Sequence, residues 1–215
     1  MERSYDILNG HEINSARRAR NLKPANSIWF WSPGKSPGLP DFREKYGLRG
    51  AVVAATDLMR GIAVCAGMEF IKVEGATGNF HTNYAGKGQA AISILGSGAD
   101  FVYVHVEAPD ECGHQGNLEE KIRSIELIDE KVVFPLYGYL EENRKKTGEG
   151  YRIMVLPDHP TPVSLRTHTA DPVPFLIYEG GSVPGTQAFR FSEDTAGGLF
   201  FGRGHDLIHY FLRNK

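Results

Sequence analysis

The chain has 215 residues, of which 41% are hydrophobic and 23% are charged, the balance expected of a globular protein. A net charge of -2 gives no electrostatic basis for binding nucleic acid or an anionic membrane, and no apolar run is long enough to span a bilayer. The two cysteines imply no disulfide framework, and the polar first ten residues lack the apolar core of a signal peptide. We therefore expect a cytoplasmic location.

The first half of the chain alternates helical patterns with short apolar runs. Pro24 should end an arginine-rich first helix. Asp57 should cap the helix expected over residues 58–66. A glycine-punctuated loop at residues 75–78 follows one of the strands. In chain order we expect a helix over residues 7–22, strands over 27–31 and 50–55, a helix over 58–66, a strand over 70–73 and a helix over 86–95.

The second half contains the clearest strand pattern, at residues 101–106, whose nearly continuous apolar character suits a sheet covered on both faces. Apolar residues at helical spacing from Leu118 to Leu140 predict a long helix that Pro135 should kink. Further strands are expected over 152–156 and 174–178, and a final helix over 196–212. This alternation predicts an α/β fold with a largely parallel sheet and helices on both faces, and ligand sites just beyond the carboxyl ends of strands.

Aspartate and histidine residues gather beyond the ends of two expected strands. The first strand, over residues 101–106, runs into a carboxylate and an imidazole four positions apart, so that one turn could aim both at one ion. The second, over 152–156, runs into an adjacent Asp-His pair, whose flanking prolines could fix a turn. In chain order the candidate metal ligands are Asp110, His114, Asp158, His159 and His168. Such residues suit zinc or manganese, and paired ions can clamp the oxygens of a transferring phosphoryl group.

Each part of this pattern is common by itself, and only the ordered combination behind two strands favours a metal site. His105 alternates with apolar neighbours, which favours a core histidine, and Glu107 and Glu111 fit solvated or supporting roles better than ligand roles. The remaining histidines stand outside the pattern and suit surface or packing roles: His11, His81, His205 and His209.

The order of these residues resembles that of the alkaline phosphatase superfamily. Four further segments resemble the archaeal-type cofactor-independent (2,3-bisphosphoglycerate-independent) phosphoglycerate mutases: PANSIW at 24–29, LPDFREKYG at 39–47, GATG at 75–78 and DECGH at 110–114. The resemblance covers essentially the whole chain. Bacterial members of this group have also been proposed as homoserine kinases, and the sequence is similar to that subgroup.

The resemblance implies an alkaline-phosphatase-like fold and two divalent metal ions, Mn²⁺ or Zn²⁺. One ion would be bound by Asp110, His114 and His168, and the second by Asp158 and His159. The implied reaction is a step of glycolysis, the interconversion of 2- and 3-phosphoglycerate through a phosphoserine intermediate.

Four basic residues are weaker candidates. The resemblance suggests that Lys87 corresponds to a family lysine near the metals, although a solvated helix residue is the simpler interpretation. Arg17 and Arg20, together with Arg18, could bind substrate anions as planar donors, although a solvated helix face also accounts for them.

The chain also departs from the family pattern. The family has an Asp-Gly segment and a nucleophilic serine near its N-terminus, whereas no Asp-Gly dipeptide and no matching serine occur here. We therefore expect a C-terminal portion that is inactive alone: residues 1–24 would be the tail of an inserted domain or its return linker, and residues 25–215 the metal-binding phosphatase-like domain. The absent first strand would leave an open sheet edge, which favours homo-oligomers.

Three rival functions stay open at this level. Another phosphotransferase, such as a homoserine kinase, would show a nucleotide requirement, although the chain has no Gly-x-x-x-x-Gly-Lys-Ser/Thr loop. A metal-binding chain without catalytic activity is the second possibility. The third is a hydrolase whose nucleophile is Thr77 or Thr82, in the loop after a predicted strand.

Overall fold

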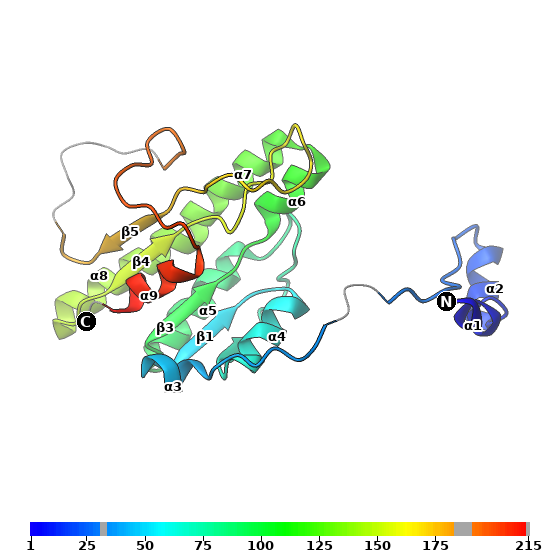
Figure 1. Cartoon of the computed structure of the whole chain (residues 1–215), viewed down its shortest axis with the longest axis horizontal. Coiled ribbons are helices and arrows are strands. Elements are labelled where there is room, and N and C mark those ends of the chain that lie inside the picture. The colour runs from blue at the N-terminus through cyan, green and yellow to red at the C-terminus, as the bar shows by residue number, and fades with distance from the viewer. Residues whose placement is uncertain (31–33, 183–190, 214–215) are drawn as a thin grey trace. The chain divides into compact units, whose positions relative to one another are not determined.

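A computed structural model describes residues 1–30, 34–182 and 191–213. The chain forms two compact units, residues 1–38 and 39–215 (Figure 1). This division falls later than the predicted one after residue 24, because hydrogen bonds hold the following residues to the first unit. The Asn14 side chain donates to the carbonyl of Ala25 at 3.0 Å, and the Ile28 N–H donates to Ser4 Oγ at 3.0 Å. The origin of residues 1–24 in an inserted domain stays a prediction.

The first unit contains two helices, α1 (Glu2–Leu8) and α2 (Glu12–Ala19), in place of the single helix predicted over residues 7–22. The break occurs because His11 caps a new helix, with its Nδ1 accepting the Ile13 N–H at 3.3 Å. The strand predicted over residues 27–31 is wrong for residues 27–30, which are irregular, and residue 31 lies outside the described residues. An apolar run forms a stable strand only where partner strands take its backbone hydrogen bonds, and the described part of this unit offers none.

The second unit is built on a parallel sheet, which confirms the predicted fold class. Its strands are β1 (Gly50–Val53), β2 (Glu69–Ile71) and β3 (Phe101–Val104), in the order β2-β1-β3. Figure 1 shows β1 and β3 side by side. The central strand β1 is buried along its whole length, as its continuous apolar sequence predicts.

Helices cover both faces of this sheet, because successive side chains of a strand point to opposite sides. Ala51 of β1 packs with Ile94 of helix α5 (Tyr84–Gly96) on one face. The next residue, Val52, packs with Ala63 of helix α4 (Asp57–Cys65) on the other. Asp57 begins α4, whereas the capping position that the sequence analysis assigned to it is occupied by Thr56.

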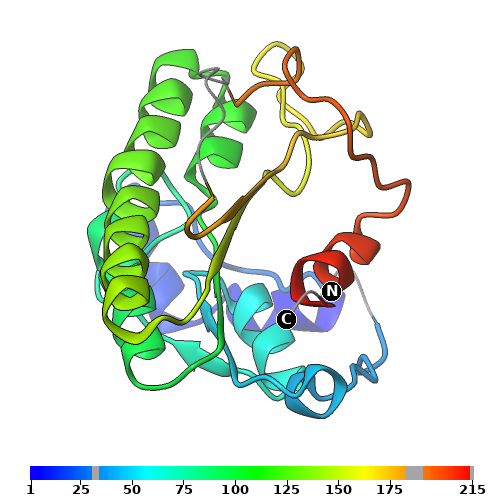
Figure 2. The same ribbon diagram turned by 90° about the vertical axis from the view of Figure 1, so that its left-hand side faces the viewer.

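Beyond the parallel sheet, two further strands pair with each other. Strands β4 (Arg152–Val155) and β5 (Leu176–Glu179) form a separate antiparallel pair. The three-stranded sheet is therefore parallel and the two-stranded one is not. Helix α9 (His205–Arg213) is shorter than the helix predicted over 196–212. It contacts β4 through Arg152, whose Nη1 donates to the carbonyl of Phe211 at 3.0 Å, and Figure 2 shows it in red.

The long helix predicted from Leu118 to Leu140 forms in three parts. These are α7 (Leu118–Ile128), a π-helical turn η1 (Asp129–Val133) and α8 (Phe134–Thr147). Pro135 has no N–H to donate and lies in the first turn of α8, where no donor is needed. The proline therefore interrupts the helix as predicted, through a π-helical turn. Among the described residues, no helix has both the length and the apolar character needed to cross a membrane.

Helix α5 crosses η1 at a glycine, which predicts a specific mutational effect. A Cβ atom on Gly88 would lie 2.5 Å from the carbonyl oxygen of Lys131, so the two backbones must separate if one is added. We expect Gly88→Ala to lower the free energy of unfolding by about 1–3 kcal/mol, measured by urea denaturation. Gly61 in α4 is the control, because a Cβ there meets nothing within 4 Å. Gly61→Ala should stabilise by roughly 0.5–1 kcal/mol, and equal effects of the two variants would contradict the packing argument.

Candidate metal centre

The site begins where β3 ends. The chain leaves the strand at His105 and enters helix α6 (Ala108–Gln115), which carries Pro109 in its first turn. Residues four apart lie on one helix face, so α6 presents Asp110 and His114 together. Asp110 Oδ2 lies 3.4 Å from His114 Nε2, as the spacing in the sequence predicts.

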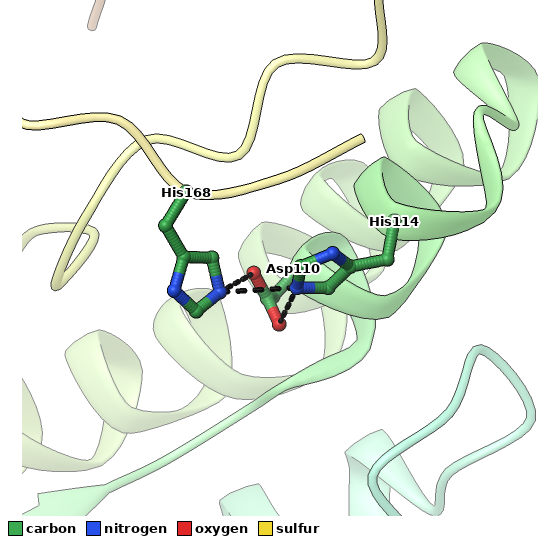
Figure 3. Close-up of side chains that lie close together, drawn as sticks. All are labelled: Asp110, His114 and His168. Atoms are coloured by element: carbon green, nitrogen blue, oxygen red, sulfur yellow. Dashed lines mark hydrogen bonds and ion pairs between the residues drawn. The ribbon is translucent and has the colours of Figure 1, made fainter. Parts of the chain in front are cut away.

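The loop after β4 brings the third member of the cluster. His168 Nε2 lies 3.2 Å from Asp110 Oδ1 and 3.0 Å from His114 Nε2, so that all three side chains converge (Figure 3). One ligand atom from each of these residues lies within 4.8 Å of the others. The opposite nitrogen of His114, Nδ1, lies 3.0 Å from the carbonyl oxygen of Arg166. Because a carbonyl can only accept, Nδ1 carries the hydrogen, and in the neutral ring Nε2 presents its lone pair to the cluster.

The predicted Asp-His pair lies beside this cluster. His159 Nε2 is 3.4 Å from Asp158 Oδ2, and His159 Nδ1 is 3.9 Å from Asp110 Oδ1. The His159 and His168 rings face each other with centroids 3.8 Å apart. The His159 N–H donates to Asp158 Oδ1 at 3.1 Å. The five predicted ligands therefore gather in one region of the second unit.

The chemistry of the donors fits a divalent cation. Asp110, His114 and His168 offer one carboxylate and two imidazole nitrogens, the residue types that bind zinc and manganese in proteins. Three protein donors would leave further coordination positions open to a substrate or water, as in catalytic metal sites.

Lys87 is fully buried, so its interpretation as a solvated helix residue is wrong. Its Nζ donates to the carbonyl of His105 at 3.0 Å, at the point where β3 ends. Burial lowers the pKa of Lys87 to about 8, and the nearby Glu107 carboxylate partly opposes this shift. The position of Lys87 on α5, packed against the sheet, removes it from water.

Two other groups near the strand end are perturbed by burial. His105 is half-buried and stacks on Tyr103, and burial lowers its pKa while the charge of Asp158 opposes the shift. Glu107 is also half-buried, and burial raises its pKa, with a further contribution from Glu111. The glycine loop predicted at residues 75–78 lies against this group: a Cβ on Gly78 would be 2.7 Å from Glu107 Oε2.

The remaining candidates lie elsewhere or stay untested. Arg17 and Arg20 belong to the first unit, where Arg17 Nε donates to the carbonyl of Lys23 at 2.8 Å, and their role in anion binding stays a prediction. Thr82 is buried and accepts the Thr77 N–H at 2.9 Å, and a nucleophilic role for either threonine stays a prediction. His209 packs on Tyr46, with Nδ1 3.2 Å from the hydroxyl oxygen, in line with a packing role.

One residue at the centre escaped the sequence analysis. Thr161 is only 4% exposed, and its hydroxyl group donates to Asp110 Oδ1. Threonine between prolines gives no local signal of such a contact, because its partner lies on a helix 51 positions earlier in the chain.

The protein is therefore an α/β protein in which strand β3 of the parallel sheet leads into Asp110 and His114, and His168 from a later loop completes a candidate metal centre. The chain belongs to the metalloenzyme superfamily, whose family model matches residues 8–202.

Within this superfamily, the chain is similar to curated phosphoglycerate mutases. The chain is 49% identical to the 2,3-bisphosphoglycerate-independent phosphoglycerate mutase of Methanothrix thermoacetophila, over 99% of this chain and 53% of that protein. It is 47% identical to a probable mutase of the same name from Geobacter sulfurreducens, over 99% of this chain and 52% of that protein. The chain thus spans about half the length of the curated relatives it matches. The resemblance found in the sequence motifs is confirmed.

Solved structures agree with the fold. The PH0037 protein from Pyrococcus horikoshii matches with a TM-score of 0.81 and 31% identity, over 97% of this chain and 53% of that chain. The cofactor-independent phosphoglycerate mutase from Thermoplasma acidophilum matches with a TM-score of 0.58 and 25% identity, over 99% of this chain and 49% of that chain.

Proposed function

We propose that this chain supplies the metal-binding half of a 2,3-bisphosphoglycerate-independent phosphoglycerate mutase, an isomerase that interconverts 2- and 3-phosphoglycerate. The observation that carries the proposal is the convergence of Asp110, His114 and His168 in a chain that is 49% identical, over nearly its whole length, to a curated mutase. A phosphorylated glycerate is the substrate that this proposal assigns to the site.

In this proposal, Asp110, His114 and His168 hold one divalent cation, and Asp158 and His159 contribute to a second, with Mn²⁺ and Zn²⁺ as the candidate ions. Divalent cations at such a site supply stabilisation of the negative charge on a transferring phosphoryl group.

The chain's own groups prepare this site. The Arg166 carbonyl orients the ring of His114, and the buried Lys87 adds a positive charge beside Glu107, because a group with a pKa of about 8 is mainly protonated at neutral pH.

The proposal is tested with a chimera. Residues 1–215 replace the matching half of the Methanothrix thermoacetophila relative, whose other half would supply the serine that the family pattern requires. We expect the chimera to interconvert 2- and 3-phosphoglycerate in a coupled assay with added Mn²⁺, and the 215-residue chain alone to be inactive. The same chimera carrying Asp110→Asn is the control and should lose the activity.

Other outcomes would support the rival functions. Turnover by the chain alone would require a nucleophile within these residues, with Thr77 and Thr82 tested first. A chimera that transfers phosphate from ATP to homoserine but leaves phosphoglycerate unchanged would replace the mutase with a kinase. A folded, metal-loaded chimera without either activity would favour a non-catalytic metal-binding chain.

A further inference from the structure

We propose that Thr161 is a positioning residue whose single hydroxyl group couples the ligands of the two cation sites. This inference rests on the proposed metal-binding function. It concerns how the chain itself aligns Asp110 and His159, which come from different elements and are assigned above to different ions.

The hydroxyl group of Thr161 meets both ligands. Its Oγ1 contacts Asp110 Oδ1 and lies 3.3 Å from His159 Nδ1. An ionised carboxylate can only accept hydrogen bonds, so the one hydroxyl hydrogen is donated to Asp110. The contact with His159 is then a hydrogen bond only if Nδ1–H donates to the hydroxyl oxygen. One hydroxyl therefore orients the carboxylate and selects the tautomer of the imidazole.

The selected tautomer has a consequence for cation binding. With the hydrogen on Nδ1, neutral His159 presents the lone pair of Nε2 toward Asp158 Oδ2, 3.4 Å away. Two acceptors that face each other at this distance are satisfied by a shared cation. The same arrangement occurs at His114, where Nδ1–H donates to the Arg166 carbonyl and Nε2 faces Asp110. Supporting hydrogen bonds of this kind set the orientation and basicity of metal-ligating histidines.

The backbone of Thr161 is held independently of its hydroxyl group. Lys121 of α7 donates from Nζ to the Thr161 carbonyl at 2.6 Å. Gly113 of α6 lies against the same carbonyl, since a Cβ there would be only 2.5 Å from its oxygen. These contacts attach the loop to α6 and α7, the former of which carries Asp110. Removal of the hydroxyl should therefore change the ligands' orientation without releasing the loop.

The experiment compares Thr161→Val, which replaces the hydroxyl with a methyl group of similar size, with Thr161→Ser, which keeps the hydroxyl. Zn²⁺ alone is titrated into the 215-residue chain against a chromophoric chelator. We expect Thr161→Val to bind about 10–100-fold more weakly than the wild type and Thr161→Ser to retain the wild-type affinity. Ser124→Ala is the matched control, because Ser124 is a fully buried hydroxyl that bonds the Lys121 carbonyl at 2.7 Å.

A second measurement does not depend on metal. In the metal-free wild type and in Thr161→Ser, ¹⁵N-correlated imidazole spectra should show His159 with the hydrogen on Nδ1, and in Thr161→Val this preference should be lost. If circular dichroism shows that the valine variant is unfolded, both measurements are made on Thr161→Ala instead. Alanine is smaller than threonine and therefore cannot clash with its neighbours.

The outcomes separate this inference from the proposed function. Thr161→Val with wild-type Zn²⁺ affinity, or Ser124→Ala weakened to the same extent, would overturn the positioning role. A wild-type chain that binds no Zn²⁺ would instead overturn the proposed metal site. In that case the imidazole spectra of the metal-free chain still decide whether Thr161 selects the His159 tautomer.

Discussion

Replacing Asp110 with asparagine is expected to remove one equivalent of tightly bound divalent cation, with a loss of affinity larger than the roughly 10–100-fold that removal of a supporting residue costs. The Asp110 carboxylate is the centre of the cluster, with oxygens 3.4 Å from His114 Nε2 and 3.2 Å from His168 Nε2. Asparagine keeps the shape of the side chain but removes its charge. It also introduces an NH₂ group, which cannot bind a cation.

The effect of Asp110→Asn is measured by Zn²⁺ titration and by elemental analysis of the chain after equilibration with Mn²⁺ or Zn²⁺. Glu111→Gln is the control. It removes a negative charge from the residue next to Asp110 on the same helix, and Glu111 is not a proposed ligand. His168→Ala should likewise remove one metal equivalent. If Asp110→Asn and Glu111→Gln bound metal equally well, the assignment of Asp110 as a ligand would be wrong.

Lys87 should make the stability of the protein depend on pH. Its pKa is about 8 in the folded chain, against an ordinary value of 10.5. Between these values the unfolded chain binds a proton that the folded chain does not, so the free energy of unfolding rises with pH. The buried charge lowers stability most below pH 8, and this cost disappears above pH 10.5. The difference between the two pKa values corresponds to about 3 kcal/mol of stability.

The free energy of unfolding of the metal-free chain is measured by urea denaturation between pH 7 and 11. The value for Lys87→Met is then subtracted from the wild-type value at each pH. Subtraction removes the contribution of groups common to both proteins, such as Tyr84, whose pKa burial raises to about 12. Lys72→Met is the matched control at an exposed lysine and should show no such dependence. A difference curve for Lys87 as flat as the one for Lys72 would contradict the burial of a titrating amine.

Much of the second unit could be predicted from local sequence. Strand β1 is a continuous apolar run, because burial on both faces of a sheet excludes polar residues from either side. Strand β3 is equally apolar in sequence but only partly buried, with Tyr103 exposed. The first unit was predicted less well. The break between α1 and α2 depends on the His11 cap, and an apolar run such as residues 27–30 becomes a strand only beside a partner.

The sequence by itself determined the candidate ligands, since Asp110 and His114 share a helix face by their spacing and Asp158 and His159 follow a strand. Only the tertiary structure decided which other groups contact the ligands or lie buried beside them. Thr161 reaches Asp110 across 51 positions, and Lys87 loses its contact with water only because α5 packs against the sheet. Side-chain hydrogen bonds and burial depend on how distant segments meet in space, which local spacing does not encode.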